Sequence, residues 1–296
     1  MSTSQDTQNN GMRSAFLFIL PLLLLLIVFI FTPIVGTIIN SFYQDIPYME
    51  QKFIMFENYK QIFVDTGFKR SLIFTLLFTG VTVPIELALG LMFALILHQN
   101  IPFRGLMRAI VLLPWAIPSA ISARVWELIF NYNYGLANFF CTQLGITHQP
   151  VNWLGSEAGA FIALVISDVW KTTPFVAIIL LAGLQAIPQE LYAQAQIDMA
   201  NSIQRFFKIT LPLLKPVLVV ALLFRTIDAL RIFDLVYVLT HGGPGGSTTS
   251  LSLYSYQYFL AGDFGYGSAV SVILFCVAFC LSLIYVKLSQ FRREII

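Results

Sequence analysis

The chain has 296 residues, of which 57% are hydrophobic and only 11% are charged. Soluble domains carry about 25% charged residues, so this composition excludes an ordinary soluble enzyme and favours a polytopic membrane protein. The formal net charge of +2 is too small to indicate binding to nucleic acid. The three cysteines form no CxxC pair, so the sequence indicates neither a redox centre nor a metal site.

Six apolar segments are long enough to cross a bilayer, which takes about 20 residues in a helix. Their approximate ranges are 13–40, 71–97, 106–130, 158–183, 209–230 and 267–288. We therefore predict an all-α integral membrane protein whose six transmembrane helices form one domain, 13–288. A flexible N-terminal segment, 1–12, and a short tail, 289–296, would then lie on the same side of the membrane.

Lys and Arg are distributed unevenly between the two sides that these spans define. The loops 131–157 and 232–266 contain neither residue. The side that holds both termini carries the larger basic set: Arg13, Arg104, Arg108, Arg205, Lys208, Lys215, Lys287, Arg292 and Arg293. Because Lys and Arg accumulate in cytoplasmic loops, we predict that both termini are cytoplasmic.

Charged side chains within the fifth span and its exit alternate in sign at a spacing of three. They are Arg225, Asp228, Arg231 and Asp234. Residues three apart are neighbours on a helix, so the set either neutralises itself and locks one helix to another, or lines a translocation path. Phe233 and Tyr237 lie nearby, and aromatic faces beside polar groups suit a sugar.

Other charged residues fall in the second, third and fourth spans. Asp168 and Lys171 in the fourth span indicate an internal pair between helices, whereas Glu86 in the second span stands alone. Arg124 and Glu127 are spaced as a local ion pair near the outer surface. The candidates for a substrate path are Trp170, Lys171, Asp228, Arg231, Asp234 and Tyr237.

The segment 185–208, between the fourth and fifth spans, is too polar to cross the membrane and too apolar for a plain loop. Its apolar residues follow helical steps of three and four: Tyr192, Ala195, Met199, Ile203 and Phe206. Such an amphipathic helix lies in lipid or docks into a protein groove. The part from Pro188 to Met199 has no Lys or Arg, which favours docking to a protein.

This segment resembles the cytoplasmic loop of binding-protein-dependent ABC importer permeases. The family pattern is EAA, three residues, G, nine residues, I, one residue, LP. Here EAA falls on Ala193-Gln194-Ala195, G on Met199, I on Ile209 and LP on Leu211-Pro212. The spacing is kept, but Ala193, Gln194 and Met199 differ from the pattern. Since glycine at a turn often has a positive φ, Met199 is predicted to be either right-handed or strained.

The resemblance extends over about 16–287 and is closest to carbohydrate importers, in particular the first permease of maltose and trehalose systems. The matching stretches are Asn58-Tyr59, Arg104-Gly105, Leu113-Pro114, Gly135-Leu136-Ala137-Asn138, Trp170-Lys171-Thr172-Thr173-Pro174, Phe233-Asp234 and Thr240-His241-Gly242-Gly243-Pro244. Polyol and glycerol-phosphate importers share much of this series, so they remain the alternative.

The resemblance implies a non-catalytic permease of a bacterial cytoplasmic (inner) membrane, which works by alternating access. Its implied partners are a second permease in a heterodimer, two ATPase subunits, an extracytoplasmic sugar-binding protein and the lipid bilayer. No G-x-x-x-x-G-K-[ST] motif is present, so the chain itself would bind no cofactor, and ATP with Mg would be used by a partner chain. The implied ATPase-docking residues are Glu190, Leu191, Tyr192, Ala193, Gln194, Ala195, Asp198 and Met199.

Two other classes of function compete with this interpretation. An ion-coupled secondary carrier would work alone, but six spans without an internal repeat are few for one, and the docking segment would have no purpose. An integral membrane enzyme would need polar residues that converge on one face, and only the set in the fifth span qualifies.

Overall fold

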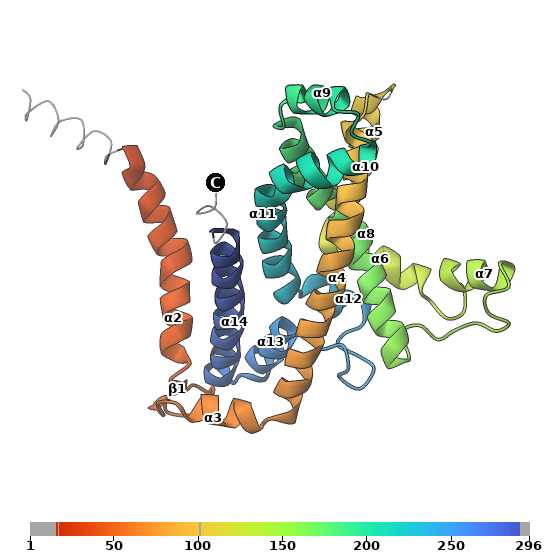
Figure 1. Cartoon of the computed structure of the whole chain (residues 1–296). Helices are drawn as coiled ribbons and strands as arrows, with labels where there is room; N and C mark the ends of the chain where they lie inside the picture. The colour runs from red at the N-terminus through yellow and green to blue at the C-terminus, as the bar shows by residue number, and fades with distance from the viewer. Residues whose placement is uncertain (1–15, 17, 101, 291–296) are drawn as a thin grey trace, which may run out of the picture.

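The computed structural model describes residue 16 and residues 18–100 and 102–290, and these form an almost entirely helical molecule (Figure 1). The predicted segment 1–12 and residues 291–296 of the predicted tail lie outside the described residues. The first half contains η1 (Ile27–Phe31), α2 (Thr32–Asn40), α3 (Glu57–Val64), α4 (Thr66–His98), α5 (Arg104–Ala116), α6 (Ser119–Ile129) and α7 (Leu136–Gln143). The second half contains α8 (Glu157–Gln185), α9 (Gln189–Ile197), α10 (Ser202–Arg205), η2 (Phe206–Thr210), α11 (Leu211–Leu230), α12 (Asp234–Leu239), α13 (Leu251–Ala261) and α14 (Phe264–Gln290). Two short strands, β1 (Tyr43–Gln44) and β2 (Lys52–Phe53), pair antiparallel.

Five helices of the described chain are long and apolar enough to cross a membrane. They cover Phe18–Asn40, Thr66–His98, Glu157–Gln185, Ser202–Leu230 and Phe264–Lys287, and a bent pair, α5 with α6, raises the number to six. The prediction of an all-α protein with up to six membrane-crossing segments is therefore confirmed.

The third predicted span, 106–130, is not one continuous helix. α5 and α6 meet at an angle of 89°. The break falls at Ile117, whose ψ of 133° is extended, and at Pro118, which precedes the first residue of α6. A residue before proline avoids the helical region, and proline itself cannot donate a helical hydrogen bond, so this pair ends α5 and redirects the chain.

The core lies where α4, α8 and α11 pack together. α4 and α8 come close at Gly90, where an added Cβ would lie 2.5 Å from Cγ1 of Val176. Gly183 of α8 plays the same part toward α11, since a Cβ there would lie 2.8 Å from Leu214. The absence of these two side chains lets the three helix backbones approach, which brings polar groups on all three within reach of one another.

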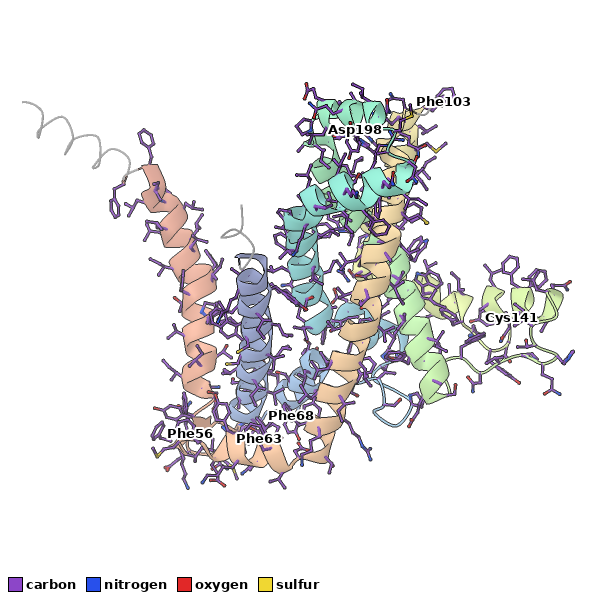
Figure 2. All side chains as sticks on the ribbon, viewed as in Figure 1. Phe56, Phe63, Phe68, Phe103, Cys141 and Asp198 are labelled. Carbon is purple, nitrogen blue, oxygen red and sulfur yellow. The ribbon has the colours of Figure 1, made fainter. Side chains whose placement is uncertain are left out.

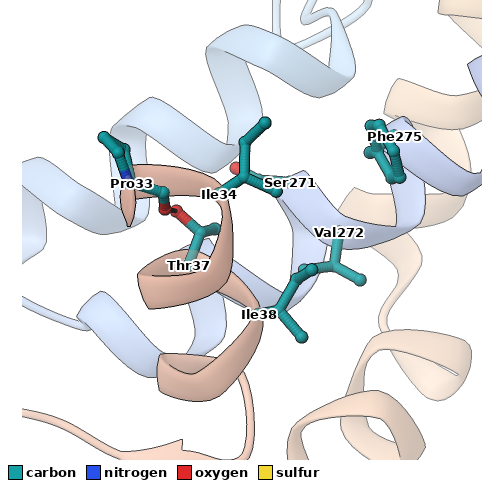
Figure 3. Close-up of a pocket in the computed structure, with 7 residues that line it drawn as sticks. All are labelled: Pro33, Ile34, Thr37, Ile38, Ser271, Val272 and Phe275. Carbon is teal, nitrogen blue, oxygen red and sulfur yellow. Dashed lines mark hydrogen bonds between the residues drawn. The ribbon is translucent and has the colours of Figure 1, made fainter. Parts of the chain in front are cut away.

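α2 stands apart from this core (Figure 1). None of the residues in the apolar window of the span Phe18–Asn40 is buried. α2 packs mainly against α14, and an apolar crevice of about 240 Å³ remains between them (Figure 3). The walls of this crevice are Pro33, Ile34, Thr37, Ile38, Ser271, Val272 and Phe275. This span therefore presents most of its apolar surface outward.

The loop that projects beside α6 is organised by one asparagine. Nδ2 of Asn138 in α7 donates to the carbonyls of Tyr132 and Val151, each at 3.1 Å. Its Oδ1 accepts from the Val151 N–H at 3.0 Å and from Nε1 of Trp153 at 2.9 Å. One side chain thus joins the segment before α7 to the segment that leads into α8.

Asp65 joins three helices at the end of the molecule opposite α9. Its Oδ1 caps α4 by accepting from the Gly67 N–H at 2.8 Å. Its Oδ2 accepts from Tyr254 of α13 and, at 2.6 Å, from Tyr266 of α14. Partial burial opposes ionisation of Asp65, but these donors outweigh it and hold the pKa of the carboxyl below its usual value.

We expect Asp65→Ala to destabilise the protein by about 2–4 kcal/mol, because a helix cap and the acceptor of two tyrosines are lost together. Tyr254→Phe removes one donor and should cost less, about 1 kcal/mol. Since the folded pKa of Asp65 is lowered, its contribution is present above the unfolded pKa of about 3.9 and disappears as pH falls through the folded value. Thermal unfolding in detergent micelles across pH measures both effects. An equal loss of stability in the two variants would contradict the role of Asp65 as the residue that joins the three helices.

Candidate functional site

A buried ion pair connects α11 to α4. Arg225 of α11 is 3% exposed and Glu86 of α4 is fully buried. Nε and Nη2 of Arg225 lie 2.6 and 3.0 Å from the two carboxylate oxygens of Glu86. The prediction that Glu86 stands alone is therefore wrong. The partner lies 139 residues away in the sequence. The sequence indicates it only indirectly, because an isolated carboxylate within a membrane helix is costly and needs a partner.

α8 contributes a third member to this network. Oδ2 of Asp168 lies 3.3 Å from Nη2 of Arg225, and the Thr172 hydroxyl lies 2.7 Å from Oε1 of Glu86. Asp168 therefore takes part in a pair between helices, as predicted, but through Arg225. Lys171 instead donates to the Ile117 carbonyl at the break between α5 and α6.

The alternating charges of the fifth span divide into a buried and an exposed part. Asp228 lies 3.6 Å from Arg225 and 2.9 Å from Arg231. The predicted self-neutralising ladder therefore exists over three residues. Asp234 does not continue it on the same helix, because α11 ends at Leu230 and Asp234 is the first residue of α12.

These side chains surround a cavity of about 290 Å³. It collects residues from α8, from α11 and from the turn into α12, together with Ser119 at the start of α6. We call it the charged cavity. Of the six residues predicted for a substrate path, four line it: Lys171, Asp228, Arg231 and Asp234.

The other two predicted path residues are aromatic and lie outside this lining. Trp170 lines a separate apolar cavity of about 480 Å³ and contacts Trp126 edge to face, with ring centroids 5.6 Å apart. Tyr237 of α12 stacks on Phe233, with centroids 5.4 Å apart and ring planes 10° from parallel. Phe233 lines the charged cavity, so Tyr237 adjoins the cavity through that ring.

The wall of the charged cavity has nearly balanced charge. Lys171, Arg225 and Arg231 supply three cations, and Asp168, Asp228 and Asp234 supply three carboxylates. Each cation already donates to a neighbouring acceptor. Among the described residues no group of His, Cys, Asp and Glu could hold a metal ion. A wall of this kind offers hydrogen bonds in both directions, which suits a polyhydroxylated solute.

The segment after α8 forms two short helices. Leu191 and Tyr192 of α9 pack against the core, and the Tyr192 hydroxyl lies 2.9 Å from Oγ1 of Thr210. α10 begins with a capping box in which the side chains and backbones of Asn201 and Gln204 bond reciprocally. The predicted single apolar stripe from Tyr192 to Phe206 is therefore wrong, because α9 ends at Ile197 and the chain turns before α10.

The turn between α9 and α10 has a left-handed residue. Met199 has a φ of 56°, so the right-handed alternative predicted for it is wrong. A non-glycine residue in this region carries strain of about 1–2 kcal/mol. Its side chain is 92% exposed, and those of Ile197 and Ile203 are 81% and 70% exposed. These three side chains define an apolar patch, the α9–α10 patch, at the end of the molecule where Phe103 and Asp198 also lie (Figure 2).

The class of this protein follows from its match to a known family. Residues 86–294 match the family described as the binding-protein-dependent transport system inner membrane component. The match covers more than half of the chain, which therefore belongs to this family of ABC importer subunits. The chain is a non-catalytic transport subunit that spans the membrane several times, and membership excludes the ion-coupled carrier and the membrane enzyme.

Relatives of known class are close in sequence. The chain is 52% identical to the trehalose/maltose transport system permease protein MalF of Thermococcus litoralis, over 95% of both chains. It is 41% identical to the trehalose transport system permease protein SugA of Mycobacterium tuberculosis, over 80% of this chain and 75% of that protein. A bacterial ABC transporter involved in alginate import has the same fold, with a TM-score of 0.83 at 24% identity over 99% of this chain and 100% of that one.

Loss of Arg225 is expected to be worse than loss of Glu86. Arg225→Gln leaves Glu86 and Asp168 buried without their shared cation and should destabilise the protein by about 3–5 kcal/mol. Glu86→Gln leaves Arg225 with Asp168 and Asp228 and should cost about 1–3 kcal/mol. The measurement is the apparent free energy of unfolding in detergent micelles. The control is Lys60→Ala, which breaks an exposed pair with Glu57 and should change stability by under about 0.5 kcal/mol. Equal losses of stability for Arg225→Gln and Glu86→Gln would contradict the shared network.

Proposed function

We propose that this chain imports a disaccharide of the trehalose or maltose type and that the charged cavity forms part of its path. The observation that carries the proposal is the wall of the charged cavity, with three cations and three carboxylates, beside the Phe233 and Tyr237 rings. Sugar hydroxyls both donate and accept hydrogen bonds, and the carbon face of a sugar ring stacks on aromatic rings. The names of the two permease relatives support the same class of cargo.

The alternative cargo, a polyol or glycerol phosphate, fits this wall less well. A phosphate group needs cations that are free to approach it. Arg225 is held by the buried Glu86, and Lys171 by a carbonyl oxygen. Of these three cations only Arg231, in an exposed pair with Asp228, could turn toward a phosphate, and the three carboxylates of the wall would repel that group. A neutral sugar can instead hydrogen-bond to the same groups without breaking their ion pairs.

In the proposed assembly the α9–α10 patch docks onto an ATPase subunit that binds and hydrolyses ATP with Mg. The three exposed apolar residues of the patch are Ile197, Met199 and Ile203. The exposed residues Ala193, Gln194 and Asp198 belong to the same segment and would take part in the docking. Leu191 and Tyr192 have the opposite role, because they anchor α9 to the core formed with α8 and α11. Movement of the docked helix would therefore reach the helices that wall the cavity, as alternating access requires.

The remaining partners follow from the two other surfaces of the chain. The α9 end would lie in the cytoplasm, because Lys and Arg accumulate on that side, and the α3 end would then face an extracytoplasmic sugar-binding protein. The exposed span that contains α2 offers apolar surface for a second, different permease. Two permeases and two ATPases would complete the importer in a cytoplasmic (inner) membrane.

Placing a carboxylate in the α9–α10 patch tests the docking. Ile197→Asp is expected to weaken binding of the ATPase about 100-fold, since an unpaired charge buried in an apolar contact costs ~3 kcal/mol or more. Co-purification of the ATPase and sugar-stimulated ATP hydrolysis measure the effect. The matched control is Ile146→Asp, which places the same charge at an exposed isoleucine after α7. An assembled, fully coupled importer carrying Ile197→Asp would refute the docking face.

Removing one cavity carboxylate tests the path. Asp234→Asn should lower ATP-driven uptake of trehalose or maltose into proteoliposomes about tenfold, because a charge-assisted hydrogen bond contributes about 1.5–3 kcal/mol. Glu57→Gln, an exposed carboxylate on α3, serves as the control. Unchanged uptake rate and half-saturation in Asp234→Asn, with normal assembly, would remove the cavity from the path. Uptake of a polyol or glycerol phosphate in place of either disaccharide would overturn the proposed cargo.

A further inference from the structure

A line of aromatic rings connects the charged cavity to a second cavity near the α3 end. Phe233 lines the charged cavity, and His241 lines the second, which has a volume of about 430 Å³. Tyr237 lies between them and contacts both rings, with centroids 5.4 Å from Phe233 and 6.0 Å from His241. The three residues recur at intervals of four in the sequence, and we call them the aromatic ladder.

The ladder is held from one side and open on the other. Tyr256 of α13 contacts Phe233 and Tyr237 edge to face, with centroid distances of 5.0 and 5.8 Å. These contacts fix the planes of both rings. The Tyr237 side chain nevertheless remains 41% exposed, so the ladder keeps aromatic surface on which a ligand can lie.

The second cavity, which we call the loop pocket, has the polar lining that the ladder lacks. Arg70 and Ser71 of α4 and Gln257 of α13 contribute side chains to it. Four glycines of the loop 242–246 also line it. The peptide groups of Gly242 and Gly243 already bond to threonine side chains, whereas Gly245 and Gly246 are exposed and can present their N–H groups. Donors and acceptors of this kind match the hydroxyl rim of a sugar.

We propose that the loop pocket is a first, outer station for the sugar and that the aromatic ladder guides it from there to the charged cavity. This inference rests on the proposed import of a disaccharide. The cargo would keep one carbon face against His241, Tyr237 and Phe233 in turn, while its hydroxyls exchange Arg70 and Gln257 for Asp234 and Lys171. Successive rings are closer together than the two ends of a disaccharide, so such a cargo would contact the next ring before it leaves the last.

The test removes the rings and keeps the backbone conformation. Tyr237→Leu keeps apolar contact with Tyr256, Tyr237→Phe keeps the ring, and His241→Asn keeps a residue that tolerates the left-handed φ of 52°. Tyr132→Ala removes a tyrosine of similar exposure, 49%, that lies outside the ladder. Each variant is assembled into the whole importer in proteoliposomes and assayed for uptake of trehalose and of maltose.

Uptake at low sugar concentration should fall about two- to tenfold in Tyr237→Leu and in His241→Asn, since an aromatic contact contributes about 0.5–1.5 kcal/mol. Tyr132→Ala should stay within twofold of the unmodified importer, and Tyr237→Phe, which keeps the ring, should lose less uptake than Tyr237→Leu. Saturation-transfer NMR tests the contact directly, on the complex in nanodiscs, without the binding protein and with trehalose as the probe. Saturation transfer to the carbon-bound protons of the trehalose rings should weaken in Tyr237→Leu and persist in Tyr237→Phe.

The two possible failures are distinct. If the unmodified importer takes up a disaccharide and both ring-removing variants match it, the ladder is refuted while the proposed function stands. If the unmodified, assembled importer takes up neither disaccharide, the proposed function is refuted and the ladder with it. Should Tyr237→Leu fail to assemble, His241→Asn decides the question alone.

Discussion

The guanidinium of Arg225 is the group on which the arrangement of this molecule depends. An ion buried without partners costs several kilocalories per mole, and a membrane core offers no water to relieve it. The planar fork of arginine can meet two carboxylates at once, and here it binds Glu86 of α4 and Asp168 of α8 while itself belonging to α11. The ion pairs fix three helices at one level, and Gly90 and Gly183 let their backbones come close enough for the bonds to form.

The ion pairs of this network differ in exposure along α11. The Arg225 and Glu86 side chains are almost wholly enclosed, whereas those of Asp228 and Arg231 are 44% and 70% exposed. Exposed ion pairs contribute little to stability, so the outer pair can exchange partners at low cost while the inner pair keeps the helices in place. The proposed path reaches this boundary from the aromatic ladder, which runs from His241 after α12 to Phe233 before it. A cargo that competes for Asp228 or Arg231 therefore leaves the core intact.

Much of the fold could be predicted from the sequence, because hydropathy and length determine which segments cross a membrane. The bend at Ile117 and Pro118 follows from the local conformational limits of proline and the residue before it. Apolar composition continues across the bend, however, so a hydropathy window joins α5 and α6 into one span. The charged cavity could be predicted only in part. Spacing within one helix revealed the pairing of Asp228 with Arg231, but the pairing of Glu86 with Arg225 joins positions 139 residues apart, and no local pattern carries that information. The sequence-based prediction includes Phe233 and Tyr237 near a charge but omits His241, which follows at the same interval of four. Tyr256, which fixes the rings, reaches them only through tertiary contacts.

Met199 has the left-handed backbone conformation that glycine favours, at a position where the family pattern has glycine. The turn is fixed from both sides: Tyr192 and Leu191 hold α9 to the core, and the capping box of Asn201 and Gln204 starts α10. The chain between these points must adopt a left-handed residue, and the strain of about 1–2 kcal/mol in methionine is smaller than the loss of either anchor together with its packing. The family pattern places glycine here for its conformational freedom. In this chain the same φ directs a flexible, polarizable side chain outward beside Ile197 and Ile203. The departure from the pattern thus adds an exposed apolar side chain to the proposed docking face.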